Sequence, residues 1–249
     1  MSLTKPTDEK IDMKFVTHPA VHTIEGKLPM SIVNEINEYL DENRQSMKDA
    51  SGTLVGQIKR NKNSDQLKMN LEDEVPKSIA NLFGSIGRSY LQKYNDIIQL
   101  SQEEGTKSWQ NAPINCENMW TVNSYDGDYN PFHDHETGYN ERKMSIVIIL
   151  YLKVPSQIEE SSYSDKSLYF NSGTIDGCTH LIWGVNTAAQ YLELRPRQDR
   201  FVKPEVGKFI MFPCWLKHQV MPFYGDGERR TLSANFTVPY KAARTFKKT

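Results

Sequence analysis

Two histidines separated by one residue, His133 and His135, are the part of the sequence best suited to chemistry. They lie in the segment 130–136, immediately before the most apolar run of the chain. Side chains of an extended strand alternate between its two faces, so these two imidazoles point the same way. Two imidazoles on one face form half of a metal site. The candidate for a further ligand is His218, 85 residues along the chain, which the fold must bring back.

The segment 229–238 carries a second group of polar side chains on one strand face. Arg229 shares this face with Thr231, Ser233 and Asn235, which is unusually polar for a core strand. A guanidinium with a hydroxyl two residues on is well suited to bind a carboxylate, because its fork donates two parallel hydrogen bonds. The neighbouring Arg230 is the alternative for this role. The pattern indicates a metal ion and an anionic organic ligand held in one β-barrel.

The elements that must position these residues begin near residue 114, where short apolar strands alternate with Gly, Pro, Asn and Asp. That texture is typical of a β-sandwich or barrel. We expect strands at 118–123, 143–152, 208–212 and 229–238, with the β-branched run 143–152 in a central position. A polar loop is expected at 156–166. A long insertion is expected at 173–200, with His180 on the surface.

Upstream of residue 114 the sequence predicts helices. Pro29 and Ser31 introduce the first, which carries Ile32, Ile36 and Leu40 on one face. The second is expected over about 76–100, with an apolar stripe at helical spacing. We expect both helices to brace a sheet and to carry no chemistry.

Composition narrows the class of protein. A chain of 249 residues with a formal net charge of −1 gives no support to nucleic-acid or anionic-membrane binding. The longest apolar run is strand-sized, too short to span a bilayer, and the N-terminus lacks the apolar core of a signal peptide. Three scattered cysteines are too few for a disulfide framework, so a cytoplasmic location is expected.

Four motifs together resemble the iron(II)- and 2-oxoglutarate-dependent oxygenases, in particular their prolyl-hydroxylase-like branch. They are residues 127–130 before His133, residues 150–155, residues 207–213 leading to His218, and residues 227–233. The resemblance implies a mainly β fold with flanking helices (α+β), built on a double-stranded β-helix (jelly-roll) barrel. It implies one domain, 1–249, with 1–113 as an N-terminal helical support with edge strands and 114–240 as the catalytic core.

The resemblance also implies a cofactor set and residue roles. His133 and His218 would bind Fe(II), and Arg229 would bind the distal carboxylate of the co-substrate 2-oxoglutarate, helped by Tyr151 and Thr231. No catalytic residue is expected beyond the metal centre. The implied activity is a hydroxylase-type oxidation of a small-molecule or peptidyl substrate that the sequence does not identify. The chain could also form a homodimer.

The metal-binding pattern departs from the family at one position. Two residues after the first histidine the family carries a carboxylate, and this chain has His135. We expect His135 as a ligand; the alternatives are Glu136 and Asp134, which would need a β-bulge to re-aim it. Three histidines are also a zinc arrangement that activates water. A zinc hydrolase or hydratase is therefore an alternative, as is a non-catalytic barrel that binds a metal or a small acid. The Arg229 clamp favours the oxygenase, because zinc–water chemistry needs no carboxylate grip.

Overall fold

The computed structural model describes residues 11–18, 21–53, 63–98, 113–135, 143–159, 175–184 and 198–239. Its helices are α1 (Met30–Asn43), the 3-10 turn η1 (Ser51–Thr53), α2 (Glu74–Ile98) and α3 (Ser156–Glu159). Its strands are β1 (Asp12–His18), β2 (Val21–Lys27), β3 (Lys48–Asp49), β4 (Asp65–Lys68), β5 (Asn115–Ser124), β6 (Asn130–His133), β7 (Lys143–Lys153), β8 (Thr179–Ile182), β9 (Asp199–Val202), β10 (Lys208–Pro213), β11 (Lys217–Val220) and β12 (Arg229–Pro239).

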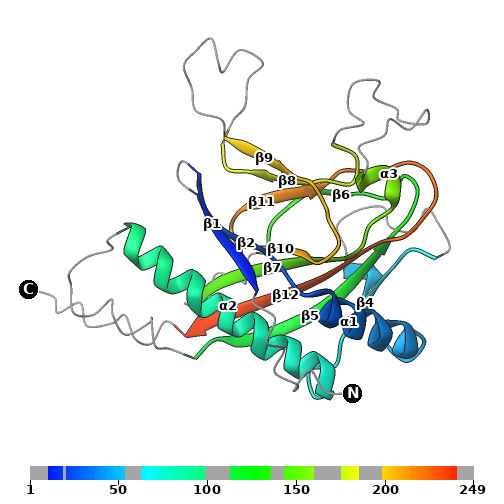
Figure 1. Cartoon of the computed structure of the whole chain (residues 1–249), viewed down its shortest axis with the longest axis horizontal. Coiled ribbons are helices and arrows are strands. Elements are labelled where there is room, and N and C mark those ends of the chain that lie inside the picture. The colour runs from blue at the N-terminus through cyan, green and yellow to red at the C-terminus, as the bar shows by residue number, and fades with distance from the viewer. Residues whose placement is uncertain are drawn as a thin grey trace, which may run out of the picture.

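The strands form two antiparallel sheets that face each other. The larger has the order β1-β2-β10-β7-β12-β5-β4-β3, and the smaller has the order β6-β11-β8-β9. Figure 1 shows the smaller sheet over one face of the larger sheet, with α1 and α2 on the other side. The larger sheet is therefore covered on both faces, and its central strands must be apolar on both.

Strand β7 shows how the sequence meets this requirement. Ile146, Ile148, Leu150 and Leu152 pack with residues of α1 and α2. The alternate residues Val147, Ile149 and Tyr151 pack between the two sheets with Leu181 and Phe212. Because side chains alternate along a strand, one continuous apolar run supplies two cores. The predicted central position of this strand is confirmed, since it lies between β10 and β12.

Strand β12 is apolar on only one of its faces. Leu232, Ala234, Phe236 and Val238 lie in the core beneath the helices. The other face carries Arg229, Thr231, Ser233 and Asn235, which line a cavity between the sheets. The polar face predicted for 229–238 is therefore present, and it lines the cavity instead of packing against the smaller sheet.

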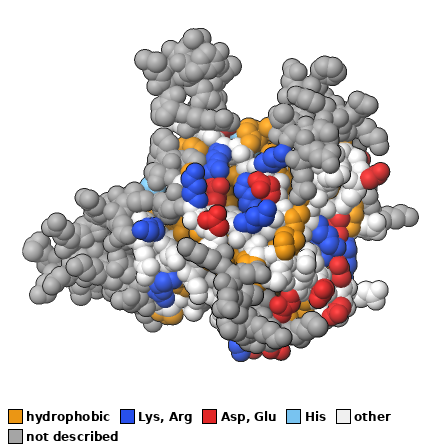
Figure 2. Space-filling view, in the orientation of Figure 1, with side chains coloured by type: hydrophobic (Ala, Val, Ile, Leu, Met, Phe, Trp, Pro, Cys, Tyr) orange, Lys and Arg blue, Asp and Glu red, His pale blue; other side chains and the backbone are white. Residues whose placement is uncertain are grey.

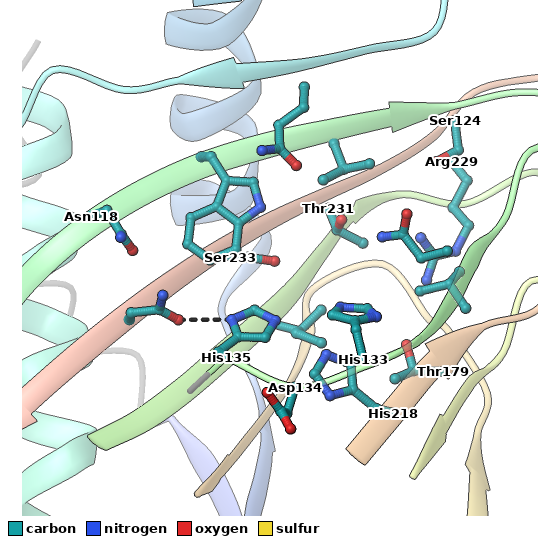
Figure 3. Close-up of a pocket in the computed structure, with 17 residues that line it drawn as sticks. Asn118, Ser124, His133, Asp134, His135, Thr179, His218, Arg229, Thr231 and Ser233 are labelled. Carbon is teal, nitrogen blue, oxygen red and sulfur yellow. Dashed lines mark hydrogen bonds between the residues drawn. The ribbon is translucent and has the colours of Figure 1, made fainter. Parts of the chain in front are cut away.

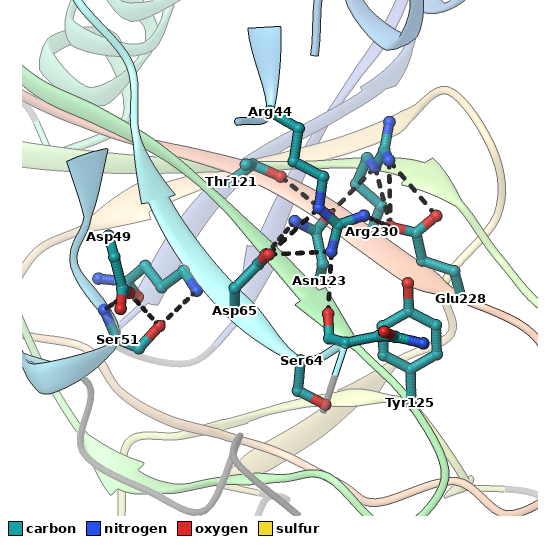
Figure 4. A network of polar contacts seen from close by, with 12 residues as sticks. Arg44, Asp49, Ser51, Ser64, Asp65, Thr121, Asn123, Tyr125, Glu228 and Arg230 are labelled. Atoms are coloured by element: carbon teal, nitrogen blue, oxygen red, sulfur yellow. Dashed lines mark hydrogen bonds and ion pairs between the residues drawn. The ribbon is translucent and has the colours of Figure 1, made fainter. Parts of the chain in front are cut away.

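Arg230 points away from this cavity and ties α1 to the larger sheet. Its guanidinium donates to Asn37 Oδ1 at 3.1 Å and Asp41 Oδ1 at 2.6 Å on α1. It also donates to Asn123 Oδ1 at 3.1 Å and Glu228 Oε1 at 3.1 Å. Figure 4 shows this network continuing through Arg44 and Asp65. With its hydrogen bonds filled by protein, Arg230 is a structural residue and is not the carboxylate clamp.

The two predicted helices are confirmed, and two expectations about loops were wrong. The segment 156–166 begins with the helical turn α3 (Ser156–Glu159), and residues 160–166 lie outside the described residues. The expected insertion 173–200 contains β8 and the start of β9, two of the four strands of the smaller sheet. His180 on β8 is not a surface residue, because its side chain is 13% exposed and is held by Asp199 Oδ2 at 2.8 Å. It also stacks on Phe201 with ring centres 3.9 Å apart.

The surface drawn in Figure 2 mixes charges of both signs. Blue Lys and Arg side chains lie beside red Asp and Glu side chains, with hydrophobic side chains between them. A mixed face of this kind does not create the single-sign field that attracts nucleic acid. Within the described residues, no helix has the length and apolar character needed to cross a membrane.

Candidate metal and co-substrate site

The three predicted histidines meet at the edge where β6 and β11 pair. His133 ends β6 and lies opposite His218 on β11, while His135 follows two residues later. Each offers a ligand atom, and these atoms all lie within 4.8 Å of one another. A metal–nitrogen bond is about 2.1 Å long, so movements of the three rings of up to about 1 Å bring them onto one ion.

Hydrogen bonds select the ring nitrogen that each histidine presents. The Nδ1 atoms of His133 and His218 lie 2.6 Å and 3.0 Å from the carbonyl oxygens of Pro131 and Leu216. His135 Nδ1 lies 2.9 Å from Asn235 Oδ1. Because these oxygens only accept, each Nδ1 carries the proton and each Nε2 keeps its lone pair for a metal. Three Nε2 atoms with free lone pairs are a suitable donor set for a metal ion.

Burial keeps all three imidazoles neutral. Desolvation lowers the pKa of His135 to about 4, and it also lowers the pKa of His133. The pKa of His218 is well below its ordinary value, because the ring is buried and lies beside the other two. A neutral imidazole is the form that binds metal, so the site does not need to lose a proton at neutral pH.

The carboxylate alternatives have different positions. Asp134 forms an ion pair with Lys217 and is not part of the three-histidine group. Glu136 lies outside the described residues. The group that the structure brings together is therefore the three histidines.

A cavity of about 390 Å³ extends from these histidines between the sheets. Its floor is made by β5 and β12, whose cavity-facing residues pair as Ser124–Arg229, Val122–Thr231, Trp120–Ser233 and Asn118–Asn235. Figure 3 shows Arg229 and Asn118 at opposite sides of the histidines. The two ends are six steps apart along each strand, which corresponds to roughly 20 Å. The cavity therefore has an Arg229 end and an Asn118 end.

Arg229 is a buried cation with an unfilled donor. Its side chain is 2% exposed, and its Nε donates to the Gly177 carbonyl oxygen at 2.9 Å. Nη2 is buried with no hydrogen-bond partner, and no carboxylate in the described part of the chain pairs with the guanidinium. Burial lowers the pKa of Arg229, but an arginine remains charged. An unpaired buried charge is costly, so this atom fits an anionic ligand that enters the cavity.

Tyr151 and Thr231 lie close to this end in different ways. Thr231 lines the cavity one step along β12 from Arg229. Tyr151 is fully buried; its ring centre is 5.3 Å from Arg229 Cζ, and its hydroxyl donates to Thr179 Oγ1 at 2.8 Å. Thr179 itself lines the cavity. Tyr151 does not line the cavity itself, but it contacts Arg229 and Thr179, which do, and so orients both.

Sequence reasoning missed several residues of the site. Thr179 and Gly177 fell in the expected insertion, although Gly177 has a φ of 67° and supplies the carbonyl that holds Arg229. A Cβ at Gly177 would lie 2.6 Å from Ile158 Cδ1, which explains the glycine. Asn235 was placed on the correct face, but its bond to His135 was not foreseen. Trp120 and Asn118 carried a signal in their shared parity on β5, which was not used.

Residues 118–235 match the family model described as "Putative 2OG-Fe(II) oxygenase". No curated protein sequence matches the chain. Among solved structures, the chain is similar to HygX from Streptomyces hygroscopicus, determined with nickel and 2-oxoglutarate bound. The identity is 11%, the match covers 89% of this chain and 83% of that chain, and the TM-score is 0.50.

A second similar structure is a prolyl-4-hydroxylase from Pseudomonas putida, with 12% identity, coverage of 92% of this chain and 93% of that chain, and a TM-score of 0.49. At such identities structural likeness speaks for fold alone. The two facing antiparallel sheets form a double-stranded β-helix, so the expected mainly β jelly-roll fold is confirmed. The family match spans the strands that carry the three histidines and Arg229. The resemblance to the 2OG-Fe(II) oxygenase family, whose members use iron(II) and 2-oxoglutarate, is therefore confirmed over residues 118–235.

Proposed function

We propose that this protein carries out a hydroxylase-type oxidation in which His133, His135 and His218 hold iron(II) and Arg229 holds 2-oxoglutarate. The observation that supports this most is the buried Arg229 Nη2, which has no partner and borders the same cavity as the three histidines. When bound, iron(II) and 2-oxoglutarate supply the chemistry that uses dioxygen to oxidise a substrate. Residues 114–240 would form the catalytic core, and residues 1–113 would support it.

The roles of the chain's own residues follow from their contacts. The three Nδ1–H groups are fixed by oxygen acceptors, which orients the rings before a metal binds. Arg229 would donate a hydrogen bond from its unpartnered Nη2 to the distal carboxylate, and the Thr231 hydroxyl would donate a second. Fixing both ends of the co-substrate sets its position relative to the metal. Tyr151 and Gly177 would hold Arg229 in place.

The three-histidine zinc hydrolase is not favoured. A zinc-bound water needs three ligands and an open position, but it gives no role to a buried, unpaired arginine. The site at Arg229, which is suited to bind a ligand carboxylate, supports the oxygenase, and so does the family match. The substrate, either a small molecule or a peptide, would bind in the part of the cavity that the metal and 2-oxoglutarate leave open.

The test is an anaerobic titration of iron(II)-loaded protein with 2-oxoglutarate, followed by visible absorption. We expect a saturable charge-transfer band in the wild type. We expect no band in His218→Ala, because a metal ligand is lost, and a band only at much higher 2-oxoglutarate concentration in Arg229→Met. A matched control is His180→Asn, which removes a histidine on the neighbouring strand β8 and should keep the band. Absence of a band in the wild type, or an unchanged titration in Arg229→Met, would refute the proposal.

A further inference from the structure

The Asn118 end of the cavity is not used by the proposed metal and co-substrate roles. It consists of Asn118 and Trp120 on β5 and Ser233 on β12, all of which line the cavity. Trp120 reaches the metal centre, because its ring centre is 5.6 Å from that of His135. A group bound here would lie beside the metal on the side away from Arg229 (Figure 3).

Asn118 has an unfilled acceptor at this end. Its Oδ1 is buried, and no donor among the described residues reaches it. The facing residue Asn235 does not fill it, because its amide oxygen accepts from His135 and its amide N–H group makes no hydrogen bond to Asn118 Oδ1. A buried polar atom without a partner is costly, so this position is completed by a ligand that donates a hydrogen bond.

Ser233 and Trp120 narrow the shape of that ligand. Ser233 lies diagonally across the strand pair from Asn118, at roughly 7–8 Å between residues two apart. Its hydroxyl can donate to an acceptor. The indole of Trp120, which is paired with Ser233, offers a flat apolar surface at the same level. The three together suit a planar group with a donor at one edge and an acceptor at the other.

The charges around the cavity disfavour a ligand carboxylate or ammonium group at the Asn118 end. Apart from the histidines, Arg229 and Asp134 are the ionisable residues among the described residues that line the cavity. Arg229 is at the opposite end, and Asp134 is paired with Lys217. A carboxylate at the Asn118 end would have no side-chain cation among the described lining residues, and it has no hydrogen to donate to Asn118 Oδ1. An ammonium would lie beside a metal whose three neutral ligands cancel none of its charge.

We propose that Asn118, Trp120 and Ser233 form a substrate subsite that binds an uncharged, planar amide group. The amide N–H donates to Asn118 Oδ1, its carbonyl accepts from Ser233 Oγ, and its plane lies on the indole of Trp120. This assignment rests on the proposed oxygenase function, because it places the substrate next to the iron. It defines the substrate by one recognised group, and the carbon to be oxidised is a neighbour of that group.

Three probes of matched shape test the assignment: benzamide, benzoate and benzamidinium. They share a ring and differ in whether the planar group is neutral, anionic or cationic. Their binding to zinc-loaded protein saturated with 2-oxoglutarate is measured by saturation-transfer NMR, with zinc as a diamagnetic stand-in and the Arg229 end filled. We expect benzamide to bind about ten-fold more tightly than either charged probe, because benzoate cannot donate to Asn118 Oδ1 and benzamidinium brings a positive charge beside the metal.

Two leucine substitutions on β5 localise the effect. Asn118→Leu should weaken benzamide binding by about ten-fold, because the acceptor is lost. Asn115→Leu, an exposed position on the same strand, should leave it unchanged. If Asn118→Leu does not fold, as judged by its thermal melt, Ser233→Ala replaces it and should weaken benzamide while leaving benzamidinium unaffected.

The outcomes separate the two proposals. Equal binding of the three probes, or unchanged benzamide affinity in the substituted protein, overturns the subsite. If the iron protein still shows its 2-oxoglutarate charge-transfer band, the proposed function survives that loss. Absence of the band in the wild type overturns the proposed function, and with it the assignment of this end to an oxygenase substrate.

Discussion

Substitution of the adjacent arginines of β12 by methionine should affect stability and 2-oxoglutarate binding differently: Arg230→Met should destabilise the fold, and Arg229→Met should weaken ligand binding. Arg229 and Arg230 are 2% and 1% exposed, but only Arg230 has its guanidinium paired with carboxylates. Arg230→Met would remove the closest cation of Glu228, whose side chain is 15% exposed and keeps only Lys153 at 3.2 Å and Arg44 at 3.6 Å. It would also leave Asn123 Oδ1 with only the long 3.4 Å contact from Thr121 Oγ1. Breaking a buried pair in this way costs about 3 kcal/mol in the free energy of unfolding. Asp41 adds little, because its side chain is 51% exposed.

Arg229→Met should change the free energy of unfolding by about 1 kcal/mol or less in the absence of 2-oxoglutarate. The substitution removes one hydrogen bond, from Nε to the Gly177 carbonyl. It also removes a buried charge that has no counterion, which offsets part of that loss. Stabilisation by 2-oxoglutarate should depend on Arg229 and not on Arg230. At a 2-oxoglutarate concentration 100 times its Kd, wild type and Arg230→Met should gain about 2.7 kcal/mol, and Arg229→Met should gain almost nothing.

Urea unfolding of the zinc-loaded proteins, followed by circular dichroism with and without 2-oxoglutarate, measures both effects. Each variant serves as the other's control, since both lose a buried arginine from the same strand. The reasoning fails if Arg229→Met is as destabilised as Arg230→Met without ligand. It also fails if 2-oxoglutarate stabilises Arg229→Met as much as the wild type.

Three further predictions concern the histidines. Asn235→Leu should lower iron(II) affinity by about 10–100-fold in a competition assay, because His135 loses the acceptor that orients it; unchanged affinity would mean that the contact does not position the ring. His135→Asp should also bind iron(II) more weakly, since the shorter side chain cannot keep the Asn235 contact; tighter binding would show that the site is built for a carboxylate. The metal-free protein should lose stability as pH falls from about 6.5 toward 4, because unfolded histidines bind protons that the buried ones, including His135 with a pKa of about 4, do not. Urea midpoints at several pH values measure this, and a flat profile that is unaffected by His135→Gln would contradict it.

What the sequence could predict was set by local periodicity. The parity of His133 and His135, the polar face from Arg229 to Asn235 and the two-sided run of β7 are properties of one strand each. They needed only the alternation of side chains. The return of His218 to His133 came from its expected ligand role and is realised by the register of β6 and β11. The helices were predictable because their apolar residues repeat with the helical period.

The errors share a physical origin. Strands β8 and β9 are four residues long and depend on pairing with β11 and with each other, so no long apolar run marks them. His180 is buried by cross-strand neighbours, Gln219 and Phe201, that sequence spacing does not bring together. The Asn235–His135 bond joins residues 100 positions apart. These features exist only once the two sheets face each other.

Strand β12 connects the support of the fold to the site. Its apolar face, with Leu232, Ala234 and Phe236, is fixed against the helices, so the polar face cannot slide or rotate. Register irregularities lie between Arg230 and Thr231 against β7 and between Asn235 and Phe236 against β5. Such irregularities change local twist and re-aim side chains. They bracket the segment that carries Thr231, Ser233 and Asn235, the positions that we propose contact the co-substrate, the substrate and the metal ligand His135. The helices therefore support the chemistry without touching it, by fixing the strand on which all three positions are spaced.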